Sequence, residues 1–269
     1  MDQLRNKINL NEAREYLINV SSRAGEILNK YFFSGDYFLK QKDGVDFTTK
    51  ADEEVDKFLI EEIKKKYPQS NFLTEETAPK DYFSLKNKEN LWIIDPLDGT
   101  INFFRKHPNF VISVALVDKS QVKLGIIHSP IKKETYWAQE DKENAFMNGK
   151  KINVSKTENL REITIACDWS WDLKKRENVV NWIGKVIDSV RQIKSMGSAA
   201  ADMASLARGQ IDAYFHSGLK TWDVAAASII IEKAGGKITT PSVNKWNIFN
   251  PDILVTNKVL HQQILRLIK

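Results

Sequence analysis

The feature that most constrains this chain is an apolar stretch that ends in two closely spaced acids. Residues 91–94 read Leu-Trp-Ile-Ile, and Asp95, Pro96 and Asp98 follow at once. Because proline has no backbone N–H to give to a sheet, we expect the strand to end before it and a tight turn to follow at Gly99. Carboxylates on a stiff turn are the hard oxygen ligands that divalent cations prefer. The sequence therefore predicts a metal site at the end of this strand.

Length and composition indicate one large globular unit or two tightly joined halves. The chain has 269 residues, of which 42% are apolar, so global disorder is excluded. The first residues are polar and no apolar run approaches transmembrane length, so we expect neither a signal peptide nor a membrane span. Cys167 is the single cysteine, which excludes an internal disulfide, and its apolar neighbours predict a buried structural thiol. A cytoplasmic protein fits best.

The net charge of +5 is spread over short lysine and arginine clusters rather than one patch. Such clusters are more often solvated faces than nucleic-acid sites, so a nucleic-acid partner is unlikely but not excluded. A mild positive field would nevertheless attract a phosphorylated small molecule.

Hydrophobic periodicity predicts alternating helices and strands throughout the chain. Helices are expected at 13–31, 50–67, 173–187, 198–208 and 223–234, with a short one near the end. Strands are expected at 91–95, 111–118, 122–128, 134–139, 163–167, 210–215 and 253–256, with a hairpin turn at 148–149. We divide the chain into an N-terminal α+β half, 1–150, with most of the metal ligands, and a C-terminal α/β half, 151–269, that closes the site.

Two sequence motifs carry a family resemblance. The first is Asp-Pro-x-Asp-Gly-Thr-x-Asn-Phe at 95–103, and the second is Trp-Asp-x-Ala-Ala at 222–226, in a segment that ends in Ala-Gly-Gly at 234–236. Together they resemble the inositol monophosphatase family over essentially the whole chain. This resemblance implies a mixed α/β fold, layered as an α-β-α-β-α sandwich, and a homodimer. It also implies a magnesium-dependent, lithium-sensitive phosphatase that hydrolyses phosphate monoesters.

The resemblance implies a set of oxygen ligands for Mg²⁺, with Mn²⁺ as an alternative. Glu75, Asp95 and the backbone carbonyl of Leu97 would bind a first ion, and Asp95, Asp98 and Asp223 a second. Glu76 would belong to a weaker third ion. Acids without Cys or His partners favour these hard cations over zinc. Each acid taken alone could instead cap a turn or a helix.

The resemblance also implies catalytic and substrate-binding residues. Glu75, Asp52 and Thr100 would be catalytic, the last two by orienting the attacking water. Local alternatives stay open, since Asp52 lies in a helical first turn and Thr100 could cap a helix. Substrate contacts are expected from two acids and from small residues near two turns, with one further side chain: Asp98, Gly99, Thr100, Gly197, Ser198, Ala199, His216 and Asp223.

His216 and Lys220 depart from the family pattern. Inositol-specific members carry Glu where His216 stands, and a neutral imidazole accepts one hydrogen bond where a carboxylate accepts more. His216 could also be a surface residue. The substrate is thus expected to be inositol monophosphate or a related sugar phosphate, with fructose bisphosphate, phosphoadenosine phosphate, NADP and histidinol phosphate as alternatives. A regulatory homologue associated with RNA or transcription is the alternative that is not an enzyme.

Overall fold

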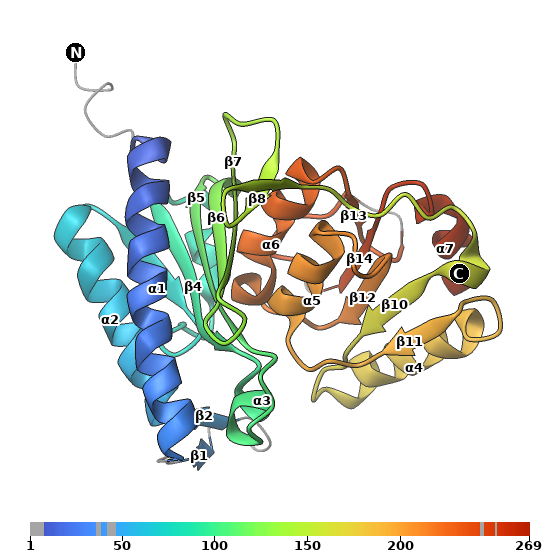
Figure 1. The fold of residues 1–269 in the computed structure, drawn as a ribbon, viewed down its shortest axis with the longest axis horizontal. Coiled ribbons are helices and arrows are strands. Elements are labelled where there is room, and N and C mark those ends of the chain that lie inside the picture. The colour runs from blue at the N-terminus through green and yellow to red at the C-terminus, as the bar shows by residue number, and fades with distance from the viewer. Residues whose placement is uncertain (1–7, 36–38, 42–46, 243–244, 251) are drawn as a thin grey trace.

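Two β-sheets and the helices around them form a layered molecule (Figure 1). The computed structural model describes residues 8–35, 39–41, 47–242, 245–250 and 252–269. One sheet has seven strands and the other five, and a short antiparallel pair, β1 (Leu39–Gln41) and β2 (Phe47–Thr49), stands apart from both.

The strands of the seven-stranded sheet lie side by side in chain order. Its strands are β3 (Asn71–Thr74), β4 (Leu91–Asp98), β5 (Val111–Asp118), β6 (Gln121–Ser129), β7 (Glu134–Gln139), β8 (Ala145–Met147) and β9 (Lys150–Ile152). Only β3 and β4 pair in parallel, and every other neighbouring pair is antiparallel. The parallel pair matters for the site because it brings the carboxyl ends of β3 and β4 to one edge of the sheet.

The five-stranded sheet has the order β11-β10-β12-β14-β13, which mixes parallel and antiparallel pairs. Its strands are β10 (Thr164–Cys167), β11 (Gln192–Lys194), β12 (Ala213–Ser217), β13 (Lys237–Thr239) and β14 (Asp252–Thr256). The parallel neighbours β11, β10 and β12 are joined through helices, as parallel strands require.

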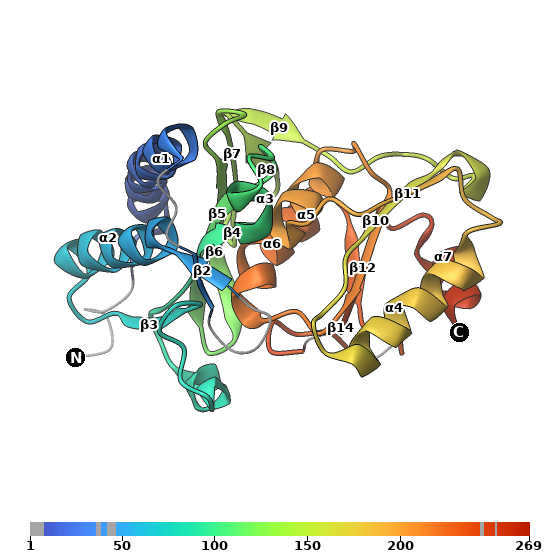
Figure 2. The ribbon, with the colours of Figure 1, turned by 90° about the horizontal axis from the view of Figure 1, so that it is seen from below.

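Helices cover both outer faces and fill the space between the sheets (Figures 1 and 2). The α-helices are α1 (Leu10–Ser34), α2 (Lys50–Lys66), α3 (Thr100–Phe104), α4 (Leu173–Val186), α5 (Ala199–Ala207), α6 (Thr221–Lys233) and α7 (His261–Ile268), and the 3₁₀ helices are η1 (Tyr82–Asn87) and η2 (Leu160–Glu162). Asn9 caps α1 by accepting from the backbone N–H groups of Asn11 and Glu12, as its position before the helix predicts.

Alternation along the strands explains the layer order. Trp92 and Ile94 of β4 pack with α1 and α2, whereas Leu91 and Ile93 face the opposite cluster with α5 and α6. The second sheet alternates in the same way, between the α5–α6 layer and an outer cluster with α4 and α7. The predicted α-β-α-β-α sandwich is therefore confirmed.

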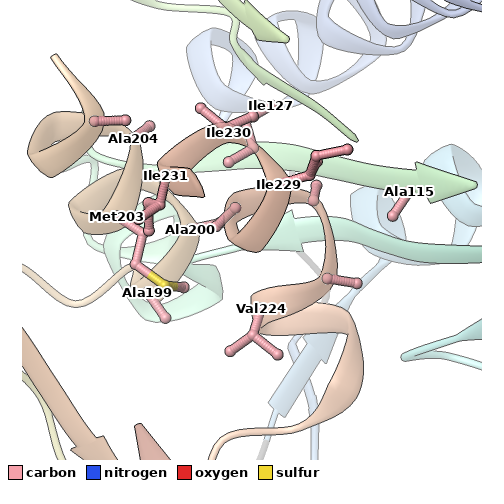
Figure 3. Close-up of a cluster of buried hydrophobic side chains, with 14 of the residues drawn as sticks. Ala115, Ile127, Ala199, Ala200, Met203, Ala204, Val224, Ile229, Ile230 and Ile231 are labelled. Atoms are coloured by element: carbon pink, nitrogen blue, oxygen red, sulfur yellow. The ribbon is translucent and has the colours of Figure 1, made fainter. Parts of the chain in front are cut away.

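The middle layer is built from small residues so that helices and sheet can approach closely (Figure 3). Ala225, Ala226 and Ala227 of α6 are almost completely buried. A Cβ atom on Gly125 of β6 would lie 2.5 Å from the carbonyl oxygen of Ala226, so only glycine fits there. This close contact fixes α6, and with it Asp223 in its first turn, against the seven-stranded sheet.

Most predicted elements are present, with shifted ends. The strand expected at 210–215 begins three residues too early, since β12 covers Ala213–Ser217. The strands β1, β2, β3, β11 and β13 were not predicted. The division at residue 150 stays a prediction; β9, at 150–152, completes the first sheet, and α5 and α6 pack against it from the C-terminal part. Within the described residues, no helix is both long and apolar enough to cross a membrane.

Candidate active site

The two acids of the first motif lie within β4, on either side of a bulge. The pairing with β5 is regular up to Asp95, shifts, and resumes at Asp98. Our prediction that the strand ends before Pro96 is therefore wrong. A proline is tolerated at a bulge because the ladder requires no N–H from it there. The bulge has the effect that the turn was expected to have, because it directs both carboxylates toward the same end of the sheet.

A cavity of about 510 Å³ opens where the two sheets and the α5–α6 layer meet. Its lining brings together segments from Phe47 to Asp223, far apart in the sequence. It includes nearly every predicted site residue: Glu75, Asp95, Leu97, Asp98, Gly99, Thr100, Gly197, Ser198, Ala199, His216 and Asp223. Asp52 does not line the cavity and reaches it through Thr100. We call Glu75, Asp95, Asp98 and Asp223 the acid wall.

Backbone N–H groups hold three carboxylates of the acid wall in place. Asp95 Oδ1 accepts from Leu97 N at 3.0 Å, and Asp98 Oδ2 accepts from Ala200 N at 2.7 Å. Asp223 Oδ2 accepts from Lys220 N at 2.6 Å in the first turn of α6. The local capping role and the proposed ligand role are thus compatible, because each cap uses one oxygen of a carboxylate that also lines the cavity.

Burial first, and repulsion from neighbouring acids second, raise the pKa values of Asp95, Asp98 and Asp223. Burial raises the pKa of Asp95 well above its usual value, and repulsion from Glu75, Asp98 and Asp223 adds to that rise. Burial raises the pKa of Asp98 to about 6, although the hydrogen bonds from Ser198 and Ala200 oppose the shift. The pKa of Asp223 is also raised well above its usual value, by burial first and then by Asp98. A cation in the cavity would relieve this repulsion.

The donor set fits a hard divalent cation, since it consists of carboxylates and one backbone carbonyl. Among the residues that the structure describes, no three acid, histidine or cysteine side chains are already arranged to hold a metal ion. Glu76 lies in a neighbouring cavity with Glu53 and Asp56 and accepts a hydrogen bond from Thr48 Oγ1 at 3.0 Å.

Asp52 and Thr100 form a hydrogen-bonded pair beside the acid wall. Asp52 is fully buried and accepts from the backbone N–H of Thr49 at 2.8 Å, in a capping box at the start of α2. Thr100 Oγ1 lies 3.2 Å from Asp52 Oδ1 and 3.1 Å from the carbonyl oxygen of Leu97. Gly99, not Thr100, is the residue that precedes α3. The Thr100 hydroxyl is therefore positioned by its partners rather than by a capping role.

Two glycine turns meet next to the acids. Gly99 has φ +99° and Gly197 has φ +74°, and a Cβ atom on Gly99 would lie 3.0 Å from Asn109 O and 3.2 Å from Ser198 Cβ. Asn102 joins them, because its Nδ2 donates to Asn109 O at 2.8 Å and to Met196 O at 2.7 Å. Asn102 belongs to the first motif, but no local pattern predicts this role.

A second pair of acids, which sequence reasoning missed, lies behind the Gly197 turn. Asp168 accepts from Ser195 Oγ at 2.6 Å and from Gly197 N at 3.2 Å. Asp202 of α5 is fully buried, and burial, Asp168 and Asp98 raise its pKa to about 9. We call these two residues the inner acid pair. The signal in the sequence was an acid inside the alanine-rich helix 199–207, where every neighbour is apolar or small.

Aromatic side chains also line the cavity. Tyr214, His216 and Trp222 line it together with Trp169 and Trp171. His216 is only 5% exposed, so the alternative of a surface residue is wrong. Burial, and then the charge of Lys175, lower the pKa of His216 to about 4, so the imidazole is neutral at pH 7. Cys167 is buried as predicted, and burial raises the pKa of its thiol to about 12.

Comparison with known proteins agrees with this geometry. The sequence profile of the inositol monophosphatase family matches residues 9–269. The chain is 32% identical over 258 residues to the fructose-1,6-bisphosphatase/inositol-1-monophosphatase of Thermotoga maritima, covering 94% of each protein, and 30% identical over 224 residues to the Nus factor SuhB of Escherichia coli, covering 82% of each.

The fold agrees as well. The crystal structure of the extragenic suppressor protein suhB from Bartonella henselae superposes with a TM-score of 0.87 at 27% identity, covering 96% of this chain and 98% of that one. With the sequence profile matched over nearly its whole length, this chain belongs to the inositol monophosphatase family of phosphoric monoester hydrolases.

Proposed function

We propose that this protein is a Mg²⁺-dependent phosphomonoesterase, for which Mn²⁺ can substitute, and that it hydrolyses a small phosphorylated metabolite by attack of water. The observation that carries the proposal is the cavity in which the acid wall, the Thr100 hydroxyl and the two glycine turns face one another. Three serines line this cavity, and two of them, Ser195 and Ser198, donate to Asp168 and Asp98. Within the described residues no histidine is hydrogen-bonded to any of the three serines, which favours water as the nucleophile.

Glu75, Asp95 and the Leu97 carbonyl would hold one cation, and Asp95, Asp98 and Asp223 a second. When bound, such ions lower the pKa of a coordinated water and neutralise charge on the phosphate and on the leaving oxygen. The acids supply the negative charge for this, and their backbone hydrogen bonds fix the orientation of the carboxylates before substrate arrives.

Thr100 and Asp52 would orient the attacking water. A hydroxyl that donates to a carboxylate still has lone pairs with which it accepts a hydrogen bond from water. Asp52 accepts from Thr49 N, and Thr100 Oγ1 donates to Asp52, so the start of α2 holds the hydroxyl in place. The pair therefore serves to position the water and to stabilise the positive charge on the proton that the water gives up.

The phosphate oxygens would be bound between the glycine turns. Gly99 and Gly197 bring backbone close to the cavity, and the N-terminus of α5 follows with Ser198 as its cap. Backbone N–H groups at a helix start favour an anion. His216 lies across the cavity and would contact the alcohol part of the substrate.

Inositol monophosphate or a related sugar phosphate is the first substrate to test. The printed name of the Thermotoga maritima relative joins fructose-1,6-bisphosphatase and inositol-1-monophosphatase activities, so both belong in the panel. A homodimer, lithium sensitivity and a cytoplasmic location are further properties that we propose on the family's pattern.

The test is release of inorganic phosphate from a panel of inositol, sugar, histidinol and nucleotide phosphates. Protein that has been treated with chelator and dialysed should be inactive and should recover when Mg²⁺ is added. Full activity in excess chelator would contradict the metal-dependent mechanism, and no release from any substrate would contradict the phosphatase assignment.

A second candidate is a regulatory role, because the Escherichia coli relative is named a Nus factor. Binding of RNA by catalytically inactive protein would support it. The complete acid wall favours hydrolysis as the primary function, since binding RNA gives no reason to crowd buried acids.

A further inference from the structure

Two exposed tryptophans stand in the same cavity as the acid wall. Trp169 and Trp171 lie on the loop between β10 and α4, and they are 46% and 52% exposed. A single exposed aromatic residue needs no explanation, but both of these line the cavity that holds the acids. Their exposed surface therefore faces the space that a substrate of this site would occupy.

The loop that carries the tryptophans is anchored at both ends. Before Trp169, Asp168 accepts hydrogen bonds from Ser195 Oγ and from Gly197 N. After Trp171, Asp172 caps α4 by accepting from Lys174 N at 3.0 Å. The indoles thus stand on a backbone that is tied to the Gly197 turn and to a helix.

Contacts within the loop also hold the second indole. The guanidinium of Arg176 lies 5.7 Å from the ring centre of Trp171, and its Nε donates to Ser170 O at 3.3 Å. A cation over one face stabilises the ring. The Lys175 side chain packs beside Gly218, where an added Cβ would lie 2.5 Å from Lys175 Cδ. Trp169 and Trp171, which we call the aromatic rim, are therefore flanked by the positive charges of Arg176 and Lys175.

Besides the acids, much of the cavity lining is aromatic or apolar. Tyr214, Leu219 and Trp222 are buried and line it with His216. Apart from the acid wall, the only carboxylate that lines the cavity is Asp168, and it already accepts from Ser195 and Gly197. The buried Tyr214 hydroxyl and His216 Nδ1 have no hydrogen-bond partner among the described residues and are available to the polar edge of a substrate, whereas a flat ring would pack against the exposed indoles.

The geometry points to a substrate whose alcohol part carries a planar aromatic ring, stacked on Trp169 and Trp171 at the mouth of the cavity. This inference rests on the proposed function, because it takes the phosphate to lie at the acid wall. In the reaction, water forms a new P–O bond, the ester P–O bond breaks, and the leaving alkoxide takes up a proton to give the ring-bearing alcohol. A nucleobase and a simple aryl group are the two sources of such a ring.

Two pairs of matched substrates distinguish a nucleobase from a simple aryl group as the source of the ring. Adenosine 5′-monophosphate and ribose 5-phosphate share a phosphorylated primary alcohol and differ in the base. Benzyl phosphate and cyclohexylmethyl phosphate differ in the aromaticity of the ring. We expect kcat/KM to be higher for the aromatic member of at least one pair. Loss of one stacking partner should lower the aromatic-to-control ratio by about ten-fold in Trp169→Ala or Trp171→Ala.

Two further variants keep the test specific. Trp169→Phe should restore most of the ratio, because phenylalanine also stacks. Phe33→Ala removes an aromatic side chain that is 73% exposed and does not line the cavity, and it should leave both rates unchanged. Quenching of tryptophan fluorescence by adenosine 5′-monophosphate, compared with the Trp169→Phe/Trp171→Phe protein, gives a readout that does not require turnover.

The outcomes distinguish this inference from the proposed function. If no phosphate ester is hydrolysed, the proposed function fails. If sugar phosphates are hydrolysed but neither pair shows a preference and neither alanine variant changes a ratio, the aromatic rim does not bind substrate. A change of oligomeric state in Trp171→Ala without any change of ratio would assign the indoles to a subunit contact and would also overturn the inference.

Discussion

The acid wall and the inner acid pair are two groups of crowded carboxyl groups on either side of the Gly197 turn, and they differ in what surrounds them. Asp95, Asp98 and Asp223 face an open cavity and each accepts a backbone N–H. Asp202 is closed off among alanines and faces the carboxyl of Asp168. Two such carboxyl groups hydrogen-bond to each other only when one holds a proton. The first arrangement suits a cation, whereas a proton shared between Asp168 and Asp202 would stabilise the second.

Asp95→Asn is the substitution with the largest expected effect, and it tests whether the acid wall binds cations. Asp95 would contact both cations, so we expect kcat/KM to fall by about a thousand-fold or more, corresponding to several kcal/mol of charge stabilisation. Because the raised pKa of Asp95 reflects repulsion in the metal-free protein, the midpoint of thermal unfolding in chelator should stay unchanged or rise slightly. Phosphate release and thermal melts measure the two effects.

The control for Asp95→Asn is Asp188→Asn, which neutralises an exposed acid far from the cavity lining. It should leave both readouts unchanged. Activity of folded Asp95→Asn within a few-fold of wild type would show that Asp95 does not bridge two ions.

Asn102→Ala tests the turn that separates the two acid groups. Loss of the hydrogen bonds to Asn109 O and Met196 O frees the Gly197 turn, to which Asp168 and the α5 cap are attached. Unsatisfied buried groups typically cost about 1–3 kcal/mol, so we expect kcat/KM to fall by about ten- to a hundred-fold. Asn71→Ala removes a similar bond, to Glu89 O at 2.8 Å, on the outside of the protein. Equal losses in both variants would refute a role specific to the site.

His216→Glu replaces a neutral imidazole of the cavity lining with a carboxylate. The new carboxylate could accept two hydroxyl groups, so kcat/KM for inositol monophosphate should rise about ten-fold relative to the best native substrate. Ratios are compared because a general loss of activity reports only damage. His107→Glu, at an exposed position outside the cavity lining, serves as control. An unchanged ranking of substrates would show that His216 does not determine which substrate is preferred.

Asp202→Asn should have the smallest effect and sharpens the comparison most. The folded-state pKa of Asp202, about 9, lies above its unfolded value, so the group is protonated at pH 7 and its contribution to stability declines as pH rises from about 4 to 9. Asparagine resembles the protonated acid in shape, so unfolding free energy at pH 7 should change by less than about 1 kcal/mol. The variant should also lose part of the wild-type decline in stability over that pH range.

Asp212→Asn is the matched control for Asp202→Asn. Asp212 is buried too, but it accepts from Thr164 N at 2.8 Å and from Ser155 Oγ, so its replacement should destabilise the protein by about 1–3 kcal/mol. Denaturant unfolding at several pH values measures both variants. Destabilisation of Asp202→Asn as large as that of Asp212→Asn would mean that Asp202 is ionised.

The sequence by itself determined the family and most of the fold. Apolar periodicity predicts α1, α2 and α4 to within a few residues, because each buries one face and ends at a cap or a proline. The two motifs place acids after apolar segments, and the structure brings those segments to one cavity. Local patterns suffice here because strand, turn and acid are adjacent in the chain.

Only the tertiary structure decided which other groups meet at the site. Asp168 and Asp202 are 34 residues apart on different elements, and nothing local marks them as a pair. No local pattern marks Trp169 and Trp171 as cavity residues, and it is the β10–α4 loop that places them in the cavity lining. The bulge at Pro96 likewise depends on β5 pairing again at Asp98. Each of these features arises from long-range packing between the sheets, which neighbouring residues in the chain do not encode.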